Sequence, residues 1–279
     1  MLLIVSIIAI VVVGIVVFFQ IPYSKLKADF NKITTEQIRQ TKVVQDVFTL
    51  DDIKGLPAPV QRYFEYCGYI GTPKMSHMKA TFKNVDFAMS PDKPKIKIDY
   101  TQHNFVAEPV RFAYIDSSMY GIPFQGLDAY DGHGSMKGVL AKTITLFNQK
   151  GKEMDVASLV TVLSESLVVP NVALQDYIVW EEMDNTHAKA TISYYGISAT
   201  GEFTFNEKGE MLSFTTNDRA VISSDGTIKQ VPWTAILGDY RETKGIKQPT
   251  LFQAVWHYDA GDLVYFDGHM TEIVYDSKQ

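Results

Sequence analysis

The longest apolar stretch of the chain lies at its N-terminus. Residues 2–19 contain no charged residue and no proline, and only Ser6 and Gly14 interrupt a run of Leu, Ile, Val, Ala and Phe. A helix rises about 1.5 Å per residue, so this run approaches the hydrocarbon thickness of a bilayer, roughly 30 Å. The pattern predicts a transmembrane helix over residues 1–20, with the membrane as a partner of residues 2–19.

A cleaved signal peptide is the alternative for this segment. Signal peptides begin with positive charge and end in small residues at the cleavage site. Here no Lys or Arg precedes the apolar run, and Gln20-Ile21-Pro22-Tyr23 follows it. We therefore expect a retained, single-pass anchor in the cell membrane. Basic residues after the helix favour a cytoplasmic domain by the positive-inside rule, whereas the family resemblance given below favours the opposite side, so the side stays open.

The pattern changes twice after the apolar run. In residues 21–50, charged residues alternate with apolar residues spaced three to five positions apart, which predicts a helical stalk leaving the membrane. Two prolines and a glycine between Asp51 and Pro59 mark a connector, and a short helix is expected from Val60 to Cys67. Residues 51–279 are expected to form one β-rich soluble domain.

From Lys74 onwards the residues follow the alternation of β-strands. Between Lys95 and Tyr100, charged and apolar residues alternate strictly, which indicates one buried face and one face in water. The segment Ser135–Asn148 is expected to be mainly strand, and Met154–Ser166 a helix that Asp155 caps. The soluble domain is therefore predicted to be mainly β (α+β), a curved antiparallel sheet with one or two inserted helices.

Composition and charge narrow the function classes. Hydrophobic residues make up 46% of the chain and aromatic residues 12%, which suits half-buried sheet surfaces. The net charge of −6 gives no basis for nucleic-acid binding, because phosphate recognition needs a clustered basic face. The single cysteine, Cys67, cannot form an intrachain disulfide and ends the expected short helix, so we expect it in the core.

The segment Asp128-x-x-Asp131-x-His133 is the clearest arrangement of polar residues. On a strand, Asp131 and His133 project to the same face, and carboxylate and imidazole groups are common zinc ligands. A zinc site needs a third and a fourth ligand, which the sequence does not indicate. The dipeptide Asp131-Gly132 is typical of a turn, and we favour that interpretation. We expect no metal or cofactor, with Asp131 and His133 as the remaining metal candidates.

Common enzyme motifs are absent from the sequence. There is no Gly-x-Ser-x-Gly nucleophile elbow, no Gly-rich phosphate loop and no His-Glu-x-x-His. Glu181 and Glu182 are adjacent, so on a strand they face opposite sides and cannot form the carboxylate pair of a glycosidase. No catalytic residue is predicted. For Arg219, in a predicted strand, a structural ion pair is favoured over ligand contact.

A series of short segments spans the soluble part in chain order. They are Leu56-Pro57-Ala58-Pro59-Val60-Gln61-Arg62-Tyr63-Phe64, Gly68, Gly71, Asp128-Ala129-Tyr130-Asp131-Gly132-His133-Gly134-Ser135-Met136, Leu159–Glu165, Pro170, Trp180, Phe203-x-Phe205, Gly209, Arg219, Pro232-Trp233, Tyr240, Gly245, Pro249, Trp256 and Tyr265. Together they resemble an uncharacterised bacterial family of membrane-anchored proteins, known only as a domain of unknown function. The resemblance covers about residues 50–276 and implies no activity and no catalytic residue.

The order of elements is also similar to the curved half-barrel of bacterial lipoprotein-carrier proteins. In those proteins one antiparallel sheet wraps helices and can hold acyl chains. The resemblance implies a half-barrel here, but it is an analogy of fold, and a fold does not fix a function. This chain departs from the soluble carriers in its retained anchor.

Aromatic residues on the predicted strands are the broadest indication of function. In a closed sandwich they would form the core, whereas in a half-open curved sheet they would line an apolar cavity, which is typical of small-molecule sites. The residues expected to line such a cavity are Tyr100, Phe112, Tyr114, Phe124, Trp180, Phe203, Phe214, Trp233 and Trp256.

The favoured hypothesis is a non-enzymatic, membrane-tethered module that binds an apolar ligand such as a lipid, an acyl chain or a lipoprotein. Two alternatives stay open. One is a structural or assembly partner in a cell-envelope complex, and the other is a metal-dependent hydrolase around Asp131 and His133. A dry and fully filled interior would count against the favoured hypothesis.

Overall fold

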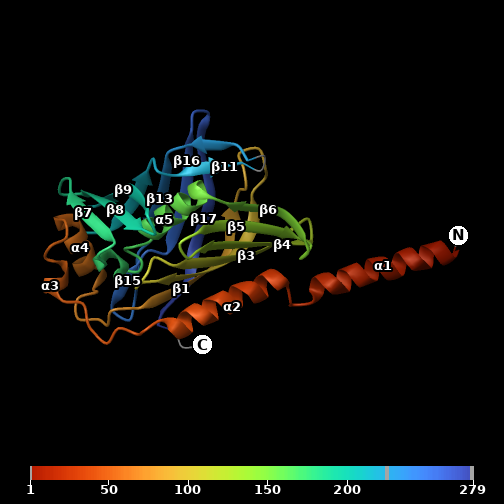
Figure 1. Ribbon diagram of the computed structural model, residues 1–279, viewed down its shortest axis with the longest axis horizontal. Helices are drawn as coiled ribbons and strands as arrows, with labels where there is room; N and C mark the ends of the chain where they lie inside the picture. The colour runs from red at the N-terminus through yellow and green to blue at the C-terminus, as the bar shows by residue number, and fades with distance from the viewer. Residues whose placement is uncertain (1, 224–225, 277–279) are drawn as a thin grey trace.

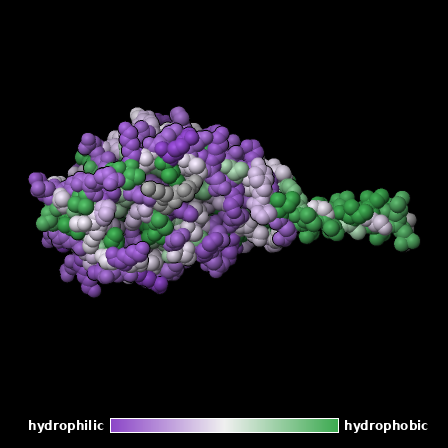
Figure 2. Space-filling model, turned by 90° about the horizontal axis from the view of Figure 1, so that it is seen from below, coloured by the Kyte–Doolittle hydropathy of each residue, from purple (hydrophilic) through white to green (hydrophobic). Residues whose placement is uncertain are grey.

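The computed structural model describes residues 2–223 and 226–276 (Figure 1). Its first element, helix α1 (Leu2–Gln20), extends away from the rest of the chain and buries none of its residues. Within the described ranges, the helical segment that begins at Leu2 is the one long and apolar enough to cross a membrane. Figure 2 shows this apolar helix projecting from a body whose surface is largely hydrophilic. The apolar N-terminal helix expected from the sequence is present.

Helix α2 (Lys25–Gln40) packs against the outer face of the sheet. Phe30 stacks on Tyr114 with their ring centroids 5.5 Å apart, and its ring lies 5.8 Å from that of His103. The helix expected within residues 21–50 is therefore present, and it lies along the sheet. The division of the chain at residues 20 and 50 stays a prediction.

Two stacked histidines lie beneath α2. The rings of His77 and His103 are 5.8 Å apart and nearly parallel, and His77 also stacks on Phe105. Burial, followed by the charges of His77 and Lys79, lowers the pKa of His103 to about 3. Burial also lowers the pKa of His77, although Asp276 opposes the shift. Both rings are therefore neutral at pH 7, and Phe30 of α2 packs on the neutral ring of His103.

Thirteen strands form one antiparallel sheet that curves into a half-barrel (Figure 1). Their order is β6-β5-β4-β3-β2-β1-β17-β16-β13-β10-β9-β8-β7. The strands of this sheet are β1 (His77–Phe87), β2 (Ile96–Phe105), β3 (Arg111–Met119), β4 (Ile122–Tyr130), β5 (Gly134–Leu140), β6 (Ile144–Lys150), β7 (Ile178–Glu182), β8 (His187–Tyr194), β9 (Ile197–Phe205), β10 (Met211–Thr216), β13 (Trp233–Gly238), β16 (Leu251–Tyr258) and β17 (Gly261–Tyr275). The mainly β fold class is confirmed, with a curved antiparallel sheet behind an apolar helix.

Two short hairpins stand outside the main sheet. They are formed by β11 (Ala220–Ile222) with β12 (Ile228–Gln230), and by β14 (Arg241–Thr243) with β15 (Ile246–Gln248). The first hairpin contacts helix α5 (Lys152–Ser164). It therefore brings the loop before it, which carries Arg219, close to the inner face of the sheet.

Strand β2 has the alternation expected between Lys95 and Tyr100. Ile98 faces the core and is 1% exposed, whereas Asp99 faces outwards and accepts a hydrogen bond of 2.6 Å from Lys83 Nζ. The expected strand at Ser135–Asn148 is also present, as the β5–β6 hairpin. The period of two therefore identified the sheet correctly.

Helices cover only part of the inner face of the sheet. Helix α5 lies on β5 and β9, which belong to opposite halves of the sheet, and α4 (Ala58–Cys67) lies on β8 and β15. The shorter α3 (Leu50–Ile53) and 3₁₀ helix η1 (Val172–Leu174) add single turns. The space between these helices and the sheet is filled by buried aromatic side chains. They come from α4 itself (Tyr63 and Phe64) and from the rest of the chain, including Tyr69, Tyr130, Phe203, Phe205 and Phe214. Cys67 is buried in the same core, as expected.

The start of α5 differs from the expected one. The helix begins at Lys152, with Gly151 as its N-cap residue, and no side chain makes the capping hydrogen bond. Asp155 does not cap the helix. Its Oδ1 accepts a hydrogen bond of 2.6 Å from Gly134 N, because the β4–β5 turn lies directly against the first turn of α5. Asp155 therefore joins the helix to the sheet.

Candidate ligand-binding site on the inner face of the sheet

The nine residues expected to line a cavity fall into three environments. Phe112 and Tyr114 lie on the outer face of the sheet, beneath α2. Trp180 and Trp256 are half-buried against the main core. The others are buried in that core, namely Tyr100, Phe124, Phe203, Phe214 and Trp233. The structure therefore does not bring all nine to one surface.

The side-chain alternation of β3 explains why Phe112 and Tyr114 are separated from the rest. Tyr100 faces inwards and pairs with Ile115, so Tyr114, one position earlier on β3, faces outwards. Phe105 joins them there in the cluster around Phe30. These outer aromatics hold α2 on the sheet.

The buried members of the predicted set are packed against one another. The ring of Phe203 lies 4.9 Å from that of Trp180 and 4.8 Å from that of Phe214. A Cβ on Gly201 would lie 2.1 Å from Cζ of Phe214, so the glycine makes room for that ring. This half of the inner face is therefore filled core.

A second group of inner-face aromatics is only partly covered. This group, the aromatic strip, lies on β1, β16 and β17, outside the main contacts of α4 and α5. Its members are half-buried and are Phe87, Phe252, Trp256, Tyr265 and Phe266. Of these, only Trp256 belongs to the set expected from the sequence.

Ring contacts hold the aromatic strip in place. Trp256 and Tyr265 stack with their centroids 5.9 Å apart, and Phe87 lies 6.2 Å from Tyr265. At the other end, Phe252 and Phe266 lie 5.2 Å and 5.7 Å from the buried ring of Phe82. The strip is thus a preformed apolar surface. Its rings pack against the core on one side and are partly exposed to solvent on the other.

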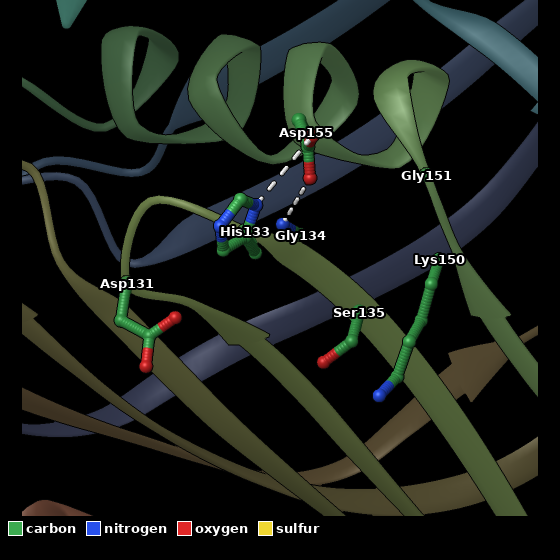
Figure 3. Close-up of a pocket in the computed structure, with 7 residues that line it drawn as sticks. All are labelled: Asp131, His133, Gly134, Ser135, Lys150, Gly151 and Asp155. Carbon is green, nitrogen blue, oxygen red and sulfur yellow. Dashed lines mark hydrogen bonds and ion pairs between the residues drawn. The ribbon is translucent and has the colours of Figure 1, made fainter. Parts of the chain in front are cut away.

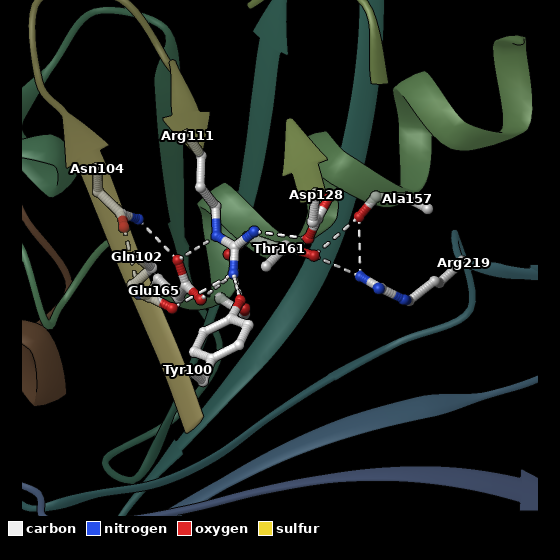
Figure 4. A network of polar contacts seen from close by, with 10 residues as sticks. Tyr100, Gln102, Asn104, Arg111, Asp128, Ala157, Thr161, Glu165 and Arg219 are labelled. Carbon is white, nitrogen blue, oxygen red and sulfur yellow. Dashed lines mark hydrogen bonds and ion pairs between the residues drawn. The ribbon is translucent and has the colours of Figure 1, made fainter. Parts of the chain in front are cut away.

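Arg111, at the start of β3, lies in a buried polar network beside this surface (Figure 4). Its Nε donates to Glu165 Oε2 at 2.9 Å, and its Nη1 donates to Asp128 Oδ2 at 2.8 Å. Burial opposes the charge of Arg111, but the carboxylates and Tyr100 hold its pKa well above the ordinary value. The guanidinium is therefore a charged centre neutralised by two carboxylates.

Three neutral side chains complete the network. Arg111 Nη2 donates to the hydroxyl of Tyr100 and to Oε1 of Gln102, while Asn104 Nδ2 donates to Glu165 Oε2 at 2.6 Å. Tyr100, Gln102 and Asn104 lie on β2, and Glu165 is the C-cap residue of α5, so the network joins the sheet to the helix. Its donors and acceptors satisfy one another, which indicates a structural role.

Arg219 presents a contrasting environment. Its guanidinium carbon lies 4.7 Å from the ring of Trp233 and 5.6 Å from that of Trp256. Its Nη1 donates to two neutral oxygens of α5, at 2.8 Å to Ala157 O and at 2.5 Å to Thr161 Oγ1 (Figure 4). The ion pair expected for Arg219 is wrong. Among the described residues its hydrogen bonds go to neutral oxygens, and no carboxylate forms an ion pair with it.

The two metal candidates from the sequence lie in an open pocket of about 390 Å³ at the β4–β5 turn (Figure 3). The side chain of His133 is 92% exposed, and its Nδ1 lies 3.9 Å from Asp155 Oδ2. Asp131 and Lys150 also line the pocket. Across the part of the chain that the structure describes, no three His, Cys, Asp or Glu residues are grouped as metal ligands.

A second pocket, of about 220 Å³, lies on the outer face between α2 and the sheet. Polar residues such as Asn31 and Asp116 line it together with Tyr114. Neither pocket is the apolar cavity expected from the sequence. The partly open apolar surface of the inner face is instead the aromatic strip.

Sequence reasoning missed the Arg111 network. One signal was available, since Arg111 is the only charged residue in the apolar run Val110–Ile115. A lone charge inside a strand that is otherwise apolar predicts a buried ion pair. Its partners, Asp128 and Glu165, are 17 and 54 residues away and carry no such signal.

The fold and this surface define a class of protein, a curved β half-barrel preceded by an apolar helix. The chain belongs to a family of unknown function (DUF6544), whose profile matches residues 46–268. The family resemblance seen in the sequence is thereby confirmed. No curated protein matches the chain.

Two solved structures are similar to the chain. One is a LolA superfamily protein from Nitrosomonas europaea, with a TM-score of 0.41 and 10% identity, covering 79% of this chain and 94% of that one. The other is a DUF1329 family protein from Desulfovibrio piger, with a TM-score of 0.34 and 9% identity, covering 79% of this chain and 95% of that one.

Proposed function

We propose that this protein is a non-enzymatic, membrane-tethered module that binds an apolar ligand, such as a lipid or an acyl chain, on the aromatic strip. The observation that carries the proposal is the strip itself, five half-buried aromatic side chains on the inner face of a curved sheet. Covering 100 Å² of such surface contributes about 2.5 kcal/mol. A ligand that lies along the strip is therefore favoured without any enclosed cavity.

The attachment of α1 supports the tether. Lys142, in the β5–β6 turn, donates from Nζ to Phe18 O at 2.9 Å and to Ile21 O at 2.5 Å, at the end of α1. A cation satisfies the free carbonyl groups of a helix C-terminus. Tyr120, 94% exposed in the β3–β4 turn, and Ile144, 56% exposed beside the β5–β6 turn, lie at the same end of the sheet. This end of the half-barrel would face the bilayer.

The intact mass of the chain purified from membranes is expected to include residues 2–19. The reason is that the apolar run has no small-residue cleavage site after it, so a signal peptidase would not remove it. Mass spectrometry of the detergent-extracted chain checks this, and extraction of the membranes at alkaline pH should leave the chain in the pellet. A product that lacks its first twenty or so residues would refute the tether.

Tryptophan fluorescence provides the test of ligand binding. The chain has three tryptophans, all in the sheet and none in α1. We expect the fluorescence of the full chain in nanodiscs to be quenched when the lipids carry brominated acyl chains, because a chain on the aromatic strip brings bromine to Trp256 and Trp233. Ordinary lipids of the same head group give the unquenched reference.

Two variants locate the quenching. A chain with Trp233→Phe and Trp256→Phe retains Trp180 on the edge strand β7, and it should lose most of the effect. The matched control, Trp180→Phe, should keep it. Equal fluorescence in brominated and ordinary lipids would contradict the proposed ligand, whatever the intact mass says about the tether.

A further inference from the structure

Two arginines contact α5 or its C-terminal end on the inner face of the sheet. One is paired with carboxylates and the other is not. Arg111 is matched by the carboxylates of Glu165 and Asp128. Arg219 is half-buried, and its contacts with the described residues are two neutral oxygens and two indole rings. Burying a cation without an anion costs free energy, and cation–π contacts offset only part of it. Arg219 is therefore a positive charge that an anion would stabilise.

The donors of Arg219 show where that anion would bind. Nη1 is used by Ala157 and Thr161 of α5, whereas no hydrogen bond joins Nη2 to any residue in the described ranges. The Nε–H is buried and also has no acceptor there. Guanidinium groups bind carboxylates and phosphates through two parallel N–H donors. Nε and Nη2 lie on the same edge of the guanidinium and form such a pair of donors.

Arg219 lies at one end of the aromatic strip. Trp256 belongs to the strip, through its stacking on Tyr265, and also lies beneath the Arg219 guanidinium. Trp233, on the neighbouring strand, donates from Nε1 to the hydroxyl of Tyr265 at 3.1 Å. The apolar surface and the unmatched cation are thus parts of one continuous site.

We propose that this site selects an anionic amphiphile, with its acyl chain on the aromatic strip and its carboxylate or phosphate oxygens on Arg219. This inference rests on the proposed function and adds the class of ligand. The argument for an anionic ligand is charge complementarity with Arg219, since the strip alone would accept any apolar chain. A neutral chain would leave Arg219 without an anion, and it is expected to bind more weakly.

The test compares one acyl chain with and without its charge. Dibrominated stearic acid and its methyl ester are titrated into the full chain in a non-ionic detergent at about pH 8, with quenching of tryptophan fluorescence as the readout. The acid is expected to bind about tenfold more tightly than the ester, the effect of one charge-assisted hydrogen-bonded contact. Arg219→Gln should make the two affinities nearly equal while retaining ester binding.

Further variants separate charge from folding. Arg219→Lys keeps the cation and should keep a preference for the acid. Arg241→Gln removes an exposed arginine of β14 and should leave the tenfold ratio unchanged. Inorganic phosphate and acetate are added as competitors, because a site that needs the acyl chain should release the acid only at far higher concentrations of these free anions.

The outcomes distinguish this inference from the proposed function. If the acid and the ester bind the unmodified chain equally, and Arg219→Gln changes neither affinity, the preference for an anionic head group is refuted. The proposal of an apolar ligand would then still hold. If free phosphate displaces the acid at similar concentrations, the site binds anions without need of the acyl chain. The inference of an amphiphilic ligand would then be refuted. Absence of quenching by both ligands would overturn the inference together with the proposed function.

Discussion

Replacement of Arg111 by Met is expected to lower the free energy of unfolding by about 3–5 kcal/mol. The substitution leaves the largely buried carboxylates of Glu165 and Asp128 without their cation. Arg111 is 4% exposed, so water cannot replace the lost guanidinium without opening the contact between α5 and the sheet. Denaturant unfolding of the full chain in detergent, followed by circular dichroism, measures the effect.

A surface ion pair provides the matched control. Lys189 lies 3.3 Å from Glu181 on neighbouring strands, with both side chains about half exposed. Lys189→Met is expected to change the free energy of unfolding by less than about 1 kcal/mol. Adding Glu165→Gln to Arg111→Met should recover part of the loss, because it removes one of the stranded charges. If the Arg111→Met and Lys189→Met variants are equally stable, the network does not hold α5 to the sheet.

Local periodicity explains which parts of the fold could be predicted. The uncharged run of α1 and the alternation around Ile98 are properties of neighbouring residues, so the sequence alone indicates a helix and a strand. The run Val110–Ile115 is apolar at nearly every position, because both faces of β3 are covered. Alternation therefore could not show that Phe112 and Tyr114 face α2 rather than the interior.

The sequence predicted aromatic residues on the inner face, but four of the five residues of the aromatic strip lie outside the predicted set. Phe252 and Phe266 lie on the strip, whereas Phe203 and Phe214 lie in filled core, and all four are aromatic residues on predicted strands. The positions of α4 and α5 on the sheet separate the two groups, and those positions depend on contacts far apart in sequence. The same holds for Arg219, whose neighbours on α5 are about 60 residues away.

The Asp131-Gly132-His133-Gly134 segment carries a carboxylate and an imidazole, but its two glycines are the positions that packing and backbone conformation restrict most. Gly132 has a φ of +102°, which favours glycine, and a Cβ there would lie 3.1 Å from the ring of Tyr195. His133 is almost fully exposed. The segment therefore forms a turn that packs against the first turn of α5, and a turn is the interpretation that the sequence favoured.

Gly134→Ala is expected to lower the free energy of unfolding by about 3 kcal/mol, the upper end of the range for overpacking. A Cβ at this position would lie 2.2 Å from the backbone oxygen of Met154 and 2.7 Å from Ser158 Oγ. A side chain can rotate away from such a contact, but the carbonyl group belongs to the first turn of α5. Relief therefore requires the helix to move off β5, which also lengthens the 2.6 Å hydrogen bond from Gly134 N to Asp155.

Gly138→Ala is the matched control, because it adds a methyl group on the same strand and the same face. It shows whether the loss of stability comes from the clash with the helix backbone or from the added methyl group alone. Its Cβ would meet the ring of Phe147 at 2.4 Å, and that ring is half-buried at the edge strand and can turn aside. We expect it to cost about 1 kcal/mol or less in the same unfolding experiment. Because α5 also presents the oxygens that hold Arg219, Gly134→Ala should weaken the preference for the acid over the ester, whereas Gly138→Ala should not. Equal stability of the two alanine variants would mean that α5 is not fixed by its contact with β5, and its placing of Arg219 would then need another cause.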